Sequence, residues 1–184
     1  MLVIGNGKSR KHVNLDLIHQ EKVGCNAIFR DWHVDHLVCC DKRLVKQSLR
    51  HHPNIYTRHR WASDFSVHSL PELITQGNDR KDEPIHWGSG PYAVLLASTL
   101  STDIKLLGFD LYGIKGKVNN LYNNTDGYST QDSNEVDPSY WIYQIAKVFE
   151  WFPKSTFTVY NTADWELPKE WNFGNVSLDI IDKL

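Results

Sequence analysis

Small polar residues follow an apolar run near the start of the chain, and their types suit the binding of an anion. The apolar residues 2–4 lead directly into Gly5-Asn6-Gly7-Lys8-Ser9. Glycines let the backbone turn tightly and bring N–H groups close to a phosphate, while Lys8 and Ser9 can add donors. The segment has neither the spacing of a P-loop nor the complete G-x-G-x-x-G dinucleotide pattern. Two interpretations stay open, a phosphate-binding loop and a plain turn between a strand and a helix.

Three further polar segments also follow apolar runs. They are Cys25-Asn26, Asp41-Lys42-Arg43 and Asp110-Leu111-Tyr112. In a parallel sheet, ligands bind at the carboxyl ends of the strands, near the point where the strand order reverses. We therefore expect these segments and the glycine segment to meet at one edge of a sheet.

A serine between two glycines begins an almost entirely apolar stretch, in the run His86-Trp87-Gly88-Ser89-Gly90-Pro91. Ser89 fits the N-cap of a helix, and a helix N-terminus beside glycines is a natural anion site. The structural alternative is that Ser89 only caps the helix and the glycines only permit close packing. The G-x-S-x-G spacing of a nucleophilic serine is not present.

The run Asp31-Trp32-His33-Val34-Asp35-His36 resembles the H-x-H-x-D-H cluster of metallo-hydrolases of the β-lactamase type, with Asp31 in place of the first histidine. His and Asp at this spacing can ligate zinc. That family needs further ligands downstream, and no histidine follows His86. Cys39 and Cys40 are neighbours on a predicted strand, so their side chains point to opposite faces. We expect no metal site.

Strand and helix patterns alternate along the chain and would position these segments. Strands are predicted at 2–5, 23–29, 36–40, 55–57, 104–109 and 157–160, and helices at 42–50, 89–100 and 140–152. Residues 63–83 give no clear pattern. The 27 residues 112–138 include four Gly/Pro and five Asn, which is typical of a lid or binding loop. The alternation predicts one Rossmann-like α/β domain over 1–184, with helices on both faces of a mostly parallel sheet.

Composition narrows the class of protein further. The chain has 184 residues, 20 Lys+Arg and 22 Asp+Glu, a formal net charge of −2, and 41% hydrophobic residues, as in an ordinary globular domain. It contains no apolar run long enough for a membrane span and no secretory signal at its start. Three cysteines make an odd number, which does not suit a disulfide framework. We expect a soluble cytoplasmic protein.

The charges are unevenly distributed. Residues 42–60 carry six Lys/Arg and no acid, whereas residues 118–146 carry four acids and no Lys or Arg. This segregation favours an anion held near the basic segment, and the alternative is a solvated basic helix and loop. A nucleic-acid contact through residues 42–60 is the least favoured hypothesis, and the aromatic pattern of an RNA-binding sheet is missing.

Taken together, the motifs resemble those of compact bacterial sialyltransferases and related Rossmann-like glycosyltransferases of flagellin and phage type. The shared pattern is a strand into G-N-G-x-S, a strand ending in C-N, a serine-glycine helix start, and a strand ending in G-[IF]-D-x-Y. Here these motifs read Gly5-Asn6-Gly7-Lys8-Ser9, Cys25-Asn26, Ser89-Gly90 and Gly108-Phe109-Asp110-Leu111-Tyr112. The resemblance covers residues 1–112, with looser similarity to about residue 160.

The resemblance implies a role for each matching residue. Asn6 and Ser9 would hold the phosphate and ribose side of the donor, Asn26 would contact the nucleotide or its sugar, and Ser89 and Gly90 would contact the sugar carboxylate or the base. Tyr112 would support the departing phosphate, so that no metal is required. The full set of candidate binding residues is Gly5, Asn6, Gly7, Ser9, Asn26, Ser89, Gly90 and Asp110.

Two family positions hold different residues here. His86 stands where the family has an arginine, and Asp137 lies where its general-base histidine is found, so the candidate catalytic residues are Tyr112, Asp137 and His86. The expected function is metal-independent transfer from a nucleotide-activated sugar, of the CMP-sialic acid kind, to a glycan or another acceptor. The alternative is a nucleotide-binding module of the same fold without catalysis.

Overall fold

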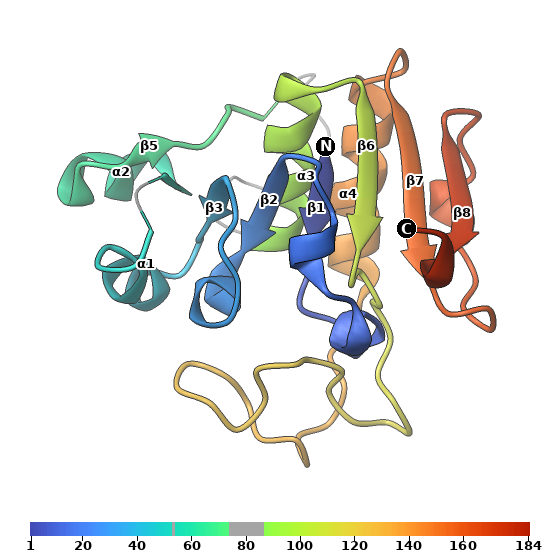
Figure 1. Ribbon diagram of the computed structural model, residues 1–184, viewed down its shortest axis with the longest axis horizontal. Helices are drawn as coiled ribbons and strands as arrows, with labels where there is room; N and C mark the ends of the chain where they lie inside the picture. Colours follow the sequence, from blue (N-terminus) through green and yellow to red (C-terminus); the bar gives the residue numbers. More distant parts are fainter. Residues whose placement is uncertain (53, 74–86) are drawn as a thin grey trace.

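The computed structural model describes residues 1–52, 54–73 and 87–184, and within these ranges eight strands form one parallel sheet (Figure 1). The strands are β1 (Leu2–Ile4), β2 (Lys22–Cys25), β3 (His36–Val38), β4 (Ile55–Thr57), β5 (His68–Ser69), β6 (Asp103–Leu107), β7 (Thr156–Asn161) and β8 (Val176–Ile180). Their order is β5-β4-β3-β2-β1-β6-β7-β8. The predicted α/β class with a parallel sheet is confirmed.

The strand order reverses at β1. The chain first adds β2 to β5 on one side of β1 and then returns to add β6 to β8 on the other side. Val3 is therefore paired with Val23 of β2 and with Leu106 of β6. In such sheets the loops diverge at the reversal point and leave a crevice at the carboxyl ends of the strands.

Four α-helices are described, and the longer two cover one face of the sheet. They are α1 (Lys42–Ser48), α2 (His59–Phe65), α3 (Ser89–Leu100) and α4 (Ser139–Trp151), together with short 3-10 helices. Helix α3 is buried along most of its length, because it packs against β1, β2, β3 and α4. The side chains of α3 and α4 form one hydrophobic core with Val3, whereas Leu2, Ile4 and α1 belong to a second core on the opposite face.

The structure corrects the sequence-based predictions at three places, and the first is the N-cap of α3, which is Gly88 and not Ser89. Strand β2 ends at Cys25, and a 3-10 helix occupies Asn26–Arg30 where the apolar pattern predicted strand as far as residue 29. Asn26 has a φ of 54°, a left-handed conformation that ends the extended backbone. Strand β8 was not predicted, although Val176, Leu178 and Ile180 alternate with polar residues as in a strand with one apolar face.

The segment 112–138, called the lid loop below, connects β6 to α4 and lies beyond the carboxyl ends of the central strands (Figure 1). Two isolated antiparallel bridges at Lys117, to Ile114 and Asn134, order its base. Part of the unplaced segment 63–83 forms the end of α2 and β5, and residues 74–86 lie outside the described chain. Among the described residues, none of the helices has the length and apolar character needed to cross a membrane.

Candidate functional site

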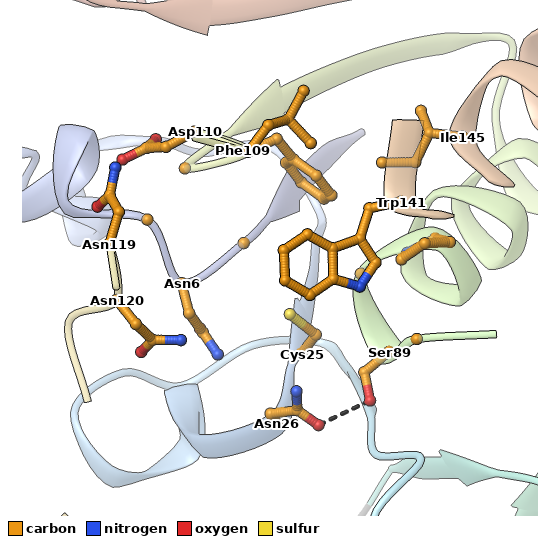
Figure 2. A pocket seen from close by; sticks show the side chains of 17 residues that line it. Asn6, Cys25, Asn26, Ser89, Phe109, Asp110, Asn119, Asn120, Trp141 and Ile145 are labelled. Carbon is orange, nitrogen blue, oxygen red and sulfur yellow. Dashed lines mark hydrogen bonds between the residues drawn. The ribbon is translucent and has the colours of Figure 1, made fainter. Parts of the chain in front are cut away.

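A cavity of about 340 Å³ lies at the reversal point of the sheet (Figure 2). Its walls come from the loop after β1, the end of β2, the first turn of α3 and the segment after β6. The lid loop adds Asn119 and Asn120, and α4 adds Trp141 and Ile145. The size and the mixed apolar and polar lining are those of a small-molecule site. The expectation that the polar strand ends meet is fulfilled for three of the four segments at this cavity.

The glycines after β1 are required by close packing of the backbone. A Cβ atom on Gly5 would collide with the carbonyl group of Gly108, and a Cβ atom on Gly7 would collide with the carboxylate of Asp110. The ends of β1 and β6 can approach this closely only because both positions lack a side chain. The glycine pattern therefore has a structural cause that is independent of any phosphate.

The backbone N–H groups of this glycine loop are largely occupied within the protein. Four bonds of the loop are Gly5 N to Leu107 O (2.8 Å), Gly7 N to Gly108 O (2.9 Å), Lys8 N to Asn119 Oδ1 (2.9 Å) and Ser9 N to Asp110 Oδ2 (2.9 Å). The Ser9 hydroxyl also donates to Asp110 Oδ1. Ser9 thus holds the buried carboxylate of Asp110, and it is not among the residues that line the cavity.

A hydrogen bond between Ser89 and Asn26 crosses the floor of the cavity (Figure 2). Ser89 Oγ donates to Asn26 Oδ1 at 2.7 Å and accepts from Cys40 N at 2.9 Å. The left-handed backbone of Asn26 turns its side chain toward the first turn of α3. Because Asn26 Oδ1 is engaged with Ser89, the amide nitrogen of Asn26 remains as the donor directed at the cavity.

A second cavity of about 260 Å³ shares Asn26, Gly88 and Ser89 with the first. It lies over the end of β3, and its other lining residues are Cys40, Asp41, Leu44, Gly127 and Tyr128. The fourth polar segment, which begins at Asp41, therefore faces this second space. The two cavities are neighbours on either side of the Asn26–Ser89 hydrogen bond.

The lid loop is attached to the glycine loop and to Arg10 just after it, in part through the buried Tyr122 and the half-buried Tyr128. Leu121 N donates to Asn6 O at 2.8 Å, Asn6 Nδ2 donates to the Tyr128 hydroxyl at 3.3 Å, and the Arg10 guanidinium donates to the Tyr122 hydroxyl at 3.3 Å. Burial raises the pKa of both tyrosines well above the ordinary value, so both stay protonated at neutral pH. The neutral hydroxyl groups of Tyr122 and Tyr128 accept hydrogen bonds from Arg10 and Asn6 and bring no negative charge to this part of the protein.

Opposite charges of the basic and acidic segments meet between α1 and the lid loop. Arg43 lies 3.8 Å from a carboxylate oxygen of Asp126, and Arg30 donates to the Asp126 carbonyl at 2.8 Å. Arg58, from the same basic segment, donates to the carbonyl of Trp87 at 2.9 Å. The uneven charge distribution therefore partly serves to hold the lid loop, and it also places a guanidinium beside the start of α3.

The structure places two of the three predicted catalytic residues away from both cavities. Tyr112 is exposed, and its ring lies 6.4 Å from that of Trp165; partial burial and the nearby carboxylates of Glu170 and Glu166 raise its pKa. Asp137 is exposed, and its Oδ1 accepts a hydrogen bond from Ser139 N at the start of α4. His86 lies outside the described residues.

In contrast to Tyr112 and Asp137, most of the predicted binding residues lie at the first cavity. Seven of them line the first cavity, namely Gly5, Asn6, Gly7, Asn26, Ser89, Gly90 and Asp110. Sequence reasoning did not identify Asn119, Asn120 or Trp141 as site residues. Trp141 stands four positions before Ile145, which places both on the same side of a helix, and this spacing could have indicated its position.

Among the described residues, His33, His36 and His52 make contacts within the protein, and the three cysteines are buried. His36 contacts Glu21 and Asn54, and His33 stacks on His52. Within residues 1–52, 54–73 and 87–184, no group of three or more His, Cys, Asp or Glu could hold a metal ion. All three cysteines are free and buried, and burial raises the pKa of Cys25 to about 12, so its thiol is protonated at neutral pH.

Comparisons of the chain with known protein families, with curated proteins and with solved structures gave no match. The fold and the site define an α/β protein with a Rossmann-like parallel sheet and a cavity of ligand size at its reversal point. Its function is therefore inferred from the site itself.

Proposed function

We propose that the first cavity binds the nucleotide of a CMP-sialic-acid-like donor and that the protein transfers the sugar to an acceptor without a metal ion. The observation that supports this most is the position of the cavity, where parallel sheets of this topology bind nucleotides. Around this one space the chain gathers the first turn of α3, side-chain amides and the indole of Trp141. An anion, a ribose and a base require these three kinds of group.

The phosphate would bind at the first turn of α3. The first N–H groups of a helix have no acceptor within it, and the helix dipole favours negative charge there. Ser89 and Gly90 occupy this turn, and the Arg58 guanidinium lies next to it on the Trp87 carbonyl. The glycine loop would instead support the ribose side through Asn6, because most of its own N–H groups are already bonded.

The sugar would extend past Asn26 into the second cavity. There the acceptor oxygen would attack the anomeric carbon while the bond from that carbon to the phosphate oxygen breaks and CMP leaves with the electron pair. The acceptor proton requires a base. We assign the base to Asp41 because it lines this cavity, whereas Asp137 lines neither cavity. Both carboxylates are exposed, and each accepts one backbone N–H group, Asp41 from Arg43 at 2.8 Å and Asp137 from Ser139 at 2.9 Å.

Substitution of Gly90 tests the phosphate position. A Cβ atom there would lie 3.4 Å from Phe109 Cε1, which is an ordinary contact, so a side chain can be accommodated. Gly90→Asp places a carboxylate beside the phosphate, and Gly90→Asn is the neutral control of the same size. By calorimetry we expect Gly90→Asp to weaken CMP binding at least about tenfold, or ~1.4 kcal/mol, relative to Gly90→Asn. Equal affinity in the two variants, or no CMP binding by the wild type, would contradict the proposal.

A nucleotide-binding module without catalysis is the second candidate. It is favoured by the positions of Tyr112 and Asp137, which lie outside both cavities. The assay is release of CMP from CMP-sialic acid with and without glycan acceptors, in the presence of a chelator. Binding without turnover, unchanged in Asp41→Asn, would favour the module over the transferase.

A further inference from the structure

Trp141 is a large aromatic residue that is exposed within the first cavity. It lies in the first turn of α4 and is 37% exposed, whereas Ile142 and Ile145 of the same helix are buried in the core. Figure 2 shows its indole at the centre of the cavity, with the six-membered ring toward Asn6 and the nitrogen edge toward Ser89. A bound ligand would therefore cover an apolar surface that otherwise faces water.

The surroundings of Trp141 form an apolar wall opposite a wall of amides. Phe109 and Ile145 line the cavity on the side of the indole (Figure 2). Asn6 and Asn120 line it on the other side, where they can bond to the edge of a ring. A planar heterocycle fits this arrangement, because its face is apolar and its edge carries hydrogen-bonding groups.

Gly88 makes room for the indole beside the start of α3. A Cβ atom on Gly88 would lie 3.3 Å from Trp141 Nε1, closer than most such contacts. The nitrogen edge of Trp141 therefore lies against the turn to which the proposed function assigns the phosphate. The distance between phosphate and base in a nucleotide then directs the base along the indole, toward Asn6.

We infer that Trp141 is the stacking platform for the nucleotide base and that it determines the preference of this site for nucleotides over sugar phosphates. The inference rests on the proposed nucleotide binding and goes beyond it, because it assigns the recognition of the base to one side chain. Stacking on an indole depends on a flat ring, so a ligand without a base gains nothing from it.

The test uses the full chain, with CMP and ribose 5-phosphate as probes in calorimetry and tryptophan fluorescence. CMP is expected to quench part of the wild-type fluorescence, because a stacked base quenches the indole it covers. Trp141→Phe should lose this quenching and bind CMP within about threefold of the wild type. Trp141→Leu should bind CMP at least tenfold more weakly, with the affinity for ribose 5-phosphate unchanged.

Trp32→Phe is the matched control, because Trp32 packs against the core on the opposite face of the sheet. It should retain both the quenching and the affinity, and circular dichroism checks that every variant is folded. Wild-type affinity for CMP in folded Trp141→Leu, or an equal loss for both probes, would overturn the inference while leaving nucleotide binding intact. Failure of the wild type to bind CMP would instead overturn the proposed function, and the inference with it.

Discussion

The glycine loop after β1 and the first turn of α3 are both glycine-containing polar segments at the same cavity, yet they have opposite hydrogen-bonding states. In the loop, the N–H groups of Gly5, Gly7, Lys8 and Ser9 all have acceptors within the protein. At the start of α3, Gly88 N donates to Gln144 Oε1 at 3.2 Å and Pro91 has no N–H group, so the N–H groups of Ser89 and Gly90 are the ones directed away from any acceptor within the helix. A glycine pattern therefore identifies a place where two backbone segments approach closely. Whether an anion can bind there depends on whether the backbone N–H groups already have acceptors within the protein.

The loop should be sensitive to any added side chain. Gly5→Ala places a Cβ atom against the carbonyl of Gly108, which is backbone and cannot rotate away. We expect a loss of about 3 kcal/mol in the free energy of unfolding, measured with urea. Gly174→Ala is the control, because nothing lies within 4 Å of its added Cβ, and it should change stability by less than about 0.5 kcal/mol. Equal stability of the two variants would remove the structural explanation of the loop glycines.

Cys25 lines the first cavity between the two segments. The rate at which its thiol reacts with a reagent therefore measures how accessible this wall of the cavity is. Because burial raises the pKa of its thiol to about 12, little thiolate exists at pH 8. We expect its reaction with a disulfide reagent to be at least about a hundredfold slower than that of a free cysteine. Peptide mapping after labelling identifies the site, with chain unfolded in urea as the reference. Rapid labelling of Cys25 in the native chain would show that the wall is open.

Substitution of Ser9 distinguishes a structural role of the glycine loop from a role in ligand binding. Ser9→Ala removes the hydroxyl that donates to the buried Asp110 carboxylate, so we expect a loss of about 2 kcal/mol in stability. The affinity for CMP should change by less than about twofold, a difference below ~0.4 kcal/mol. Urea unfolding and calorimetry measure the two effects. A large loss of CMP affinity with unchanged stability would instead indicate that the phosphate binds at the glycine loop.

Raising the pH above about 10 should destabilise the protein through Tyr128, whereas near neutral pH this effect on the free energy of unfolding should be negligible. Burial raises the pKa of Tyr128 above its ordinary value of 10.0, so the folded chain holds the phenol proton more tightly than the unfolded chain does. Stability from this group is complete below pH 10 and is lost as the pH rises above it. Tyr128→Phe, which cannot ionise, should lose less stability between pH 9 and 11 than the wild type. Parallel curves for the two proteins would contradict this.

Much of the fold was predictable because the signal is local and apolar. The continuous apolar stretch that became α3 predicted a buried helix, and its burial on most sides is what the structure shows. The strand beginning at Lys22 was predicted too long, since the left-handed turn at Asn26 leaves no trace in the apolar pattern. Strand β8 was missed although its sequence, Val176-Ser177-Leu178-Asp179-Ile180, alternates apolar and polar residues, which is itself a local strand pattern.

The candidate site was predictable in part, for a similar reason. Strand ends of a parallel sheet meet at one edge, so Asn6, Asn26 and Asp110 could be grouped from the order of motifs alone. Asn120 could not, because the path of the 27-residue loop depends on tertiary packing. For Trp141 the spacing to Ile145 indicated a shared helix face, but not that this face lines the cavity. Asp137 was predicted as a base from its position after the lid loop, but it lines neither cavity.

Residue types and their order along the chain are enough to define the class of fold, the positions at which the backbone must turn and the set of polar residues at the strand ends. These depend on residue type and on the period of the apolar pattern, which are local properties. The tertiary structure alone decided which N–H groups are occupied, which carboxylate lines a cavity and which aromatic ring faces it. Those properties depend on contacts between residues far apart in the chain, such as Ser9 with Asp110 and Asn26 with Ser89.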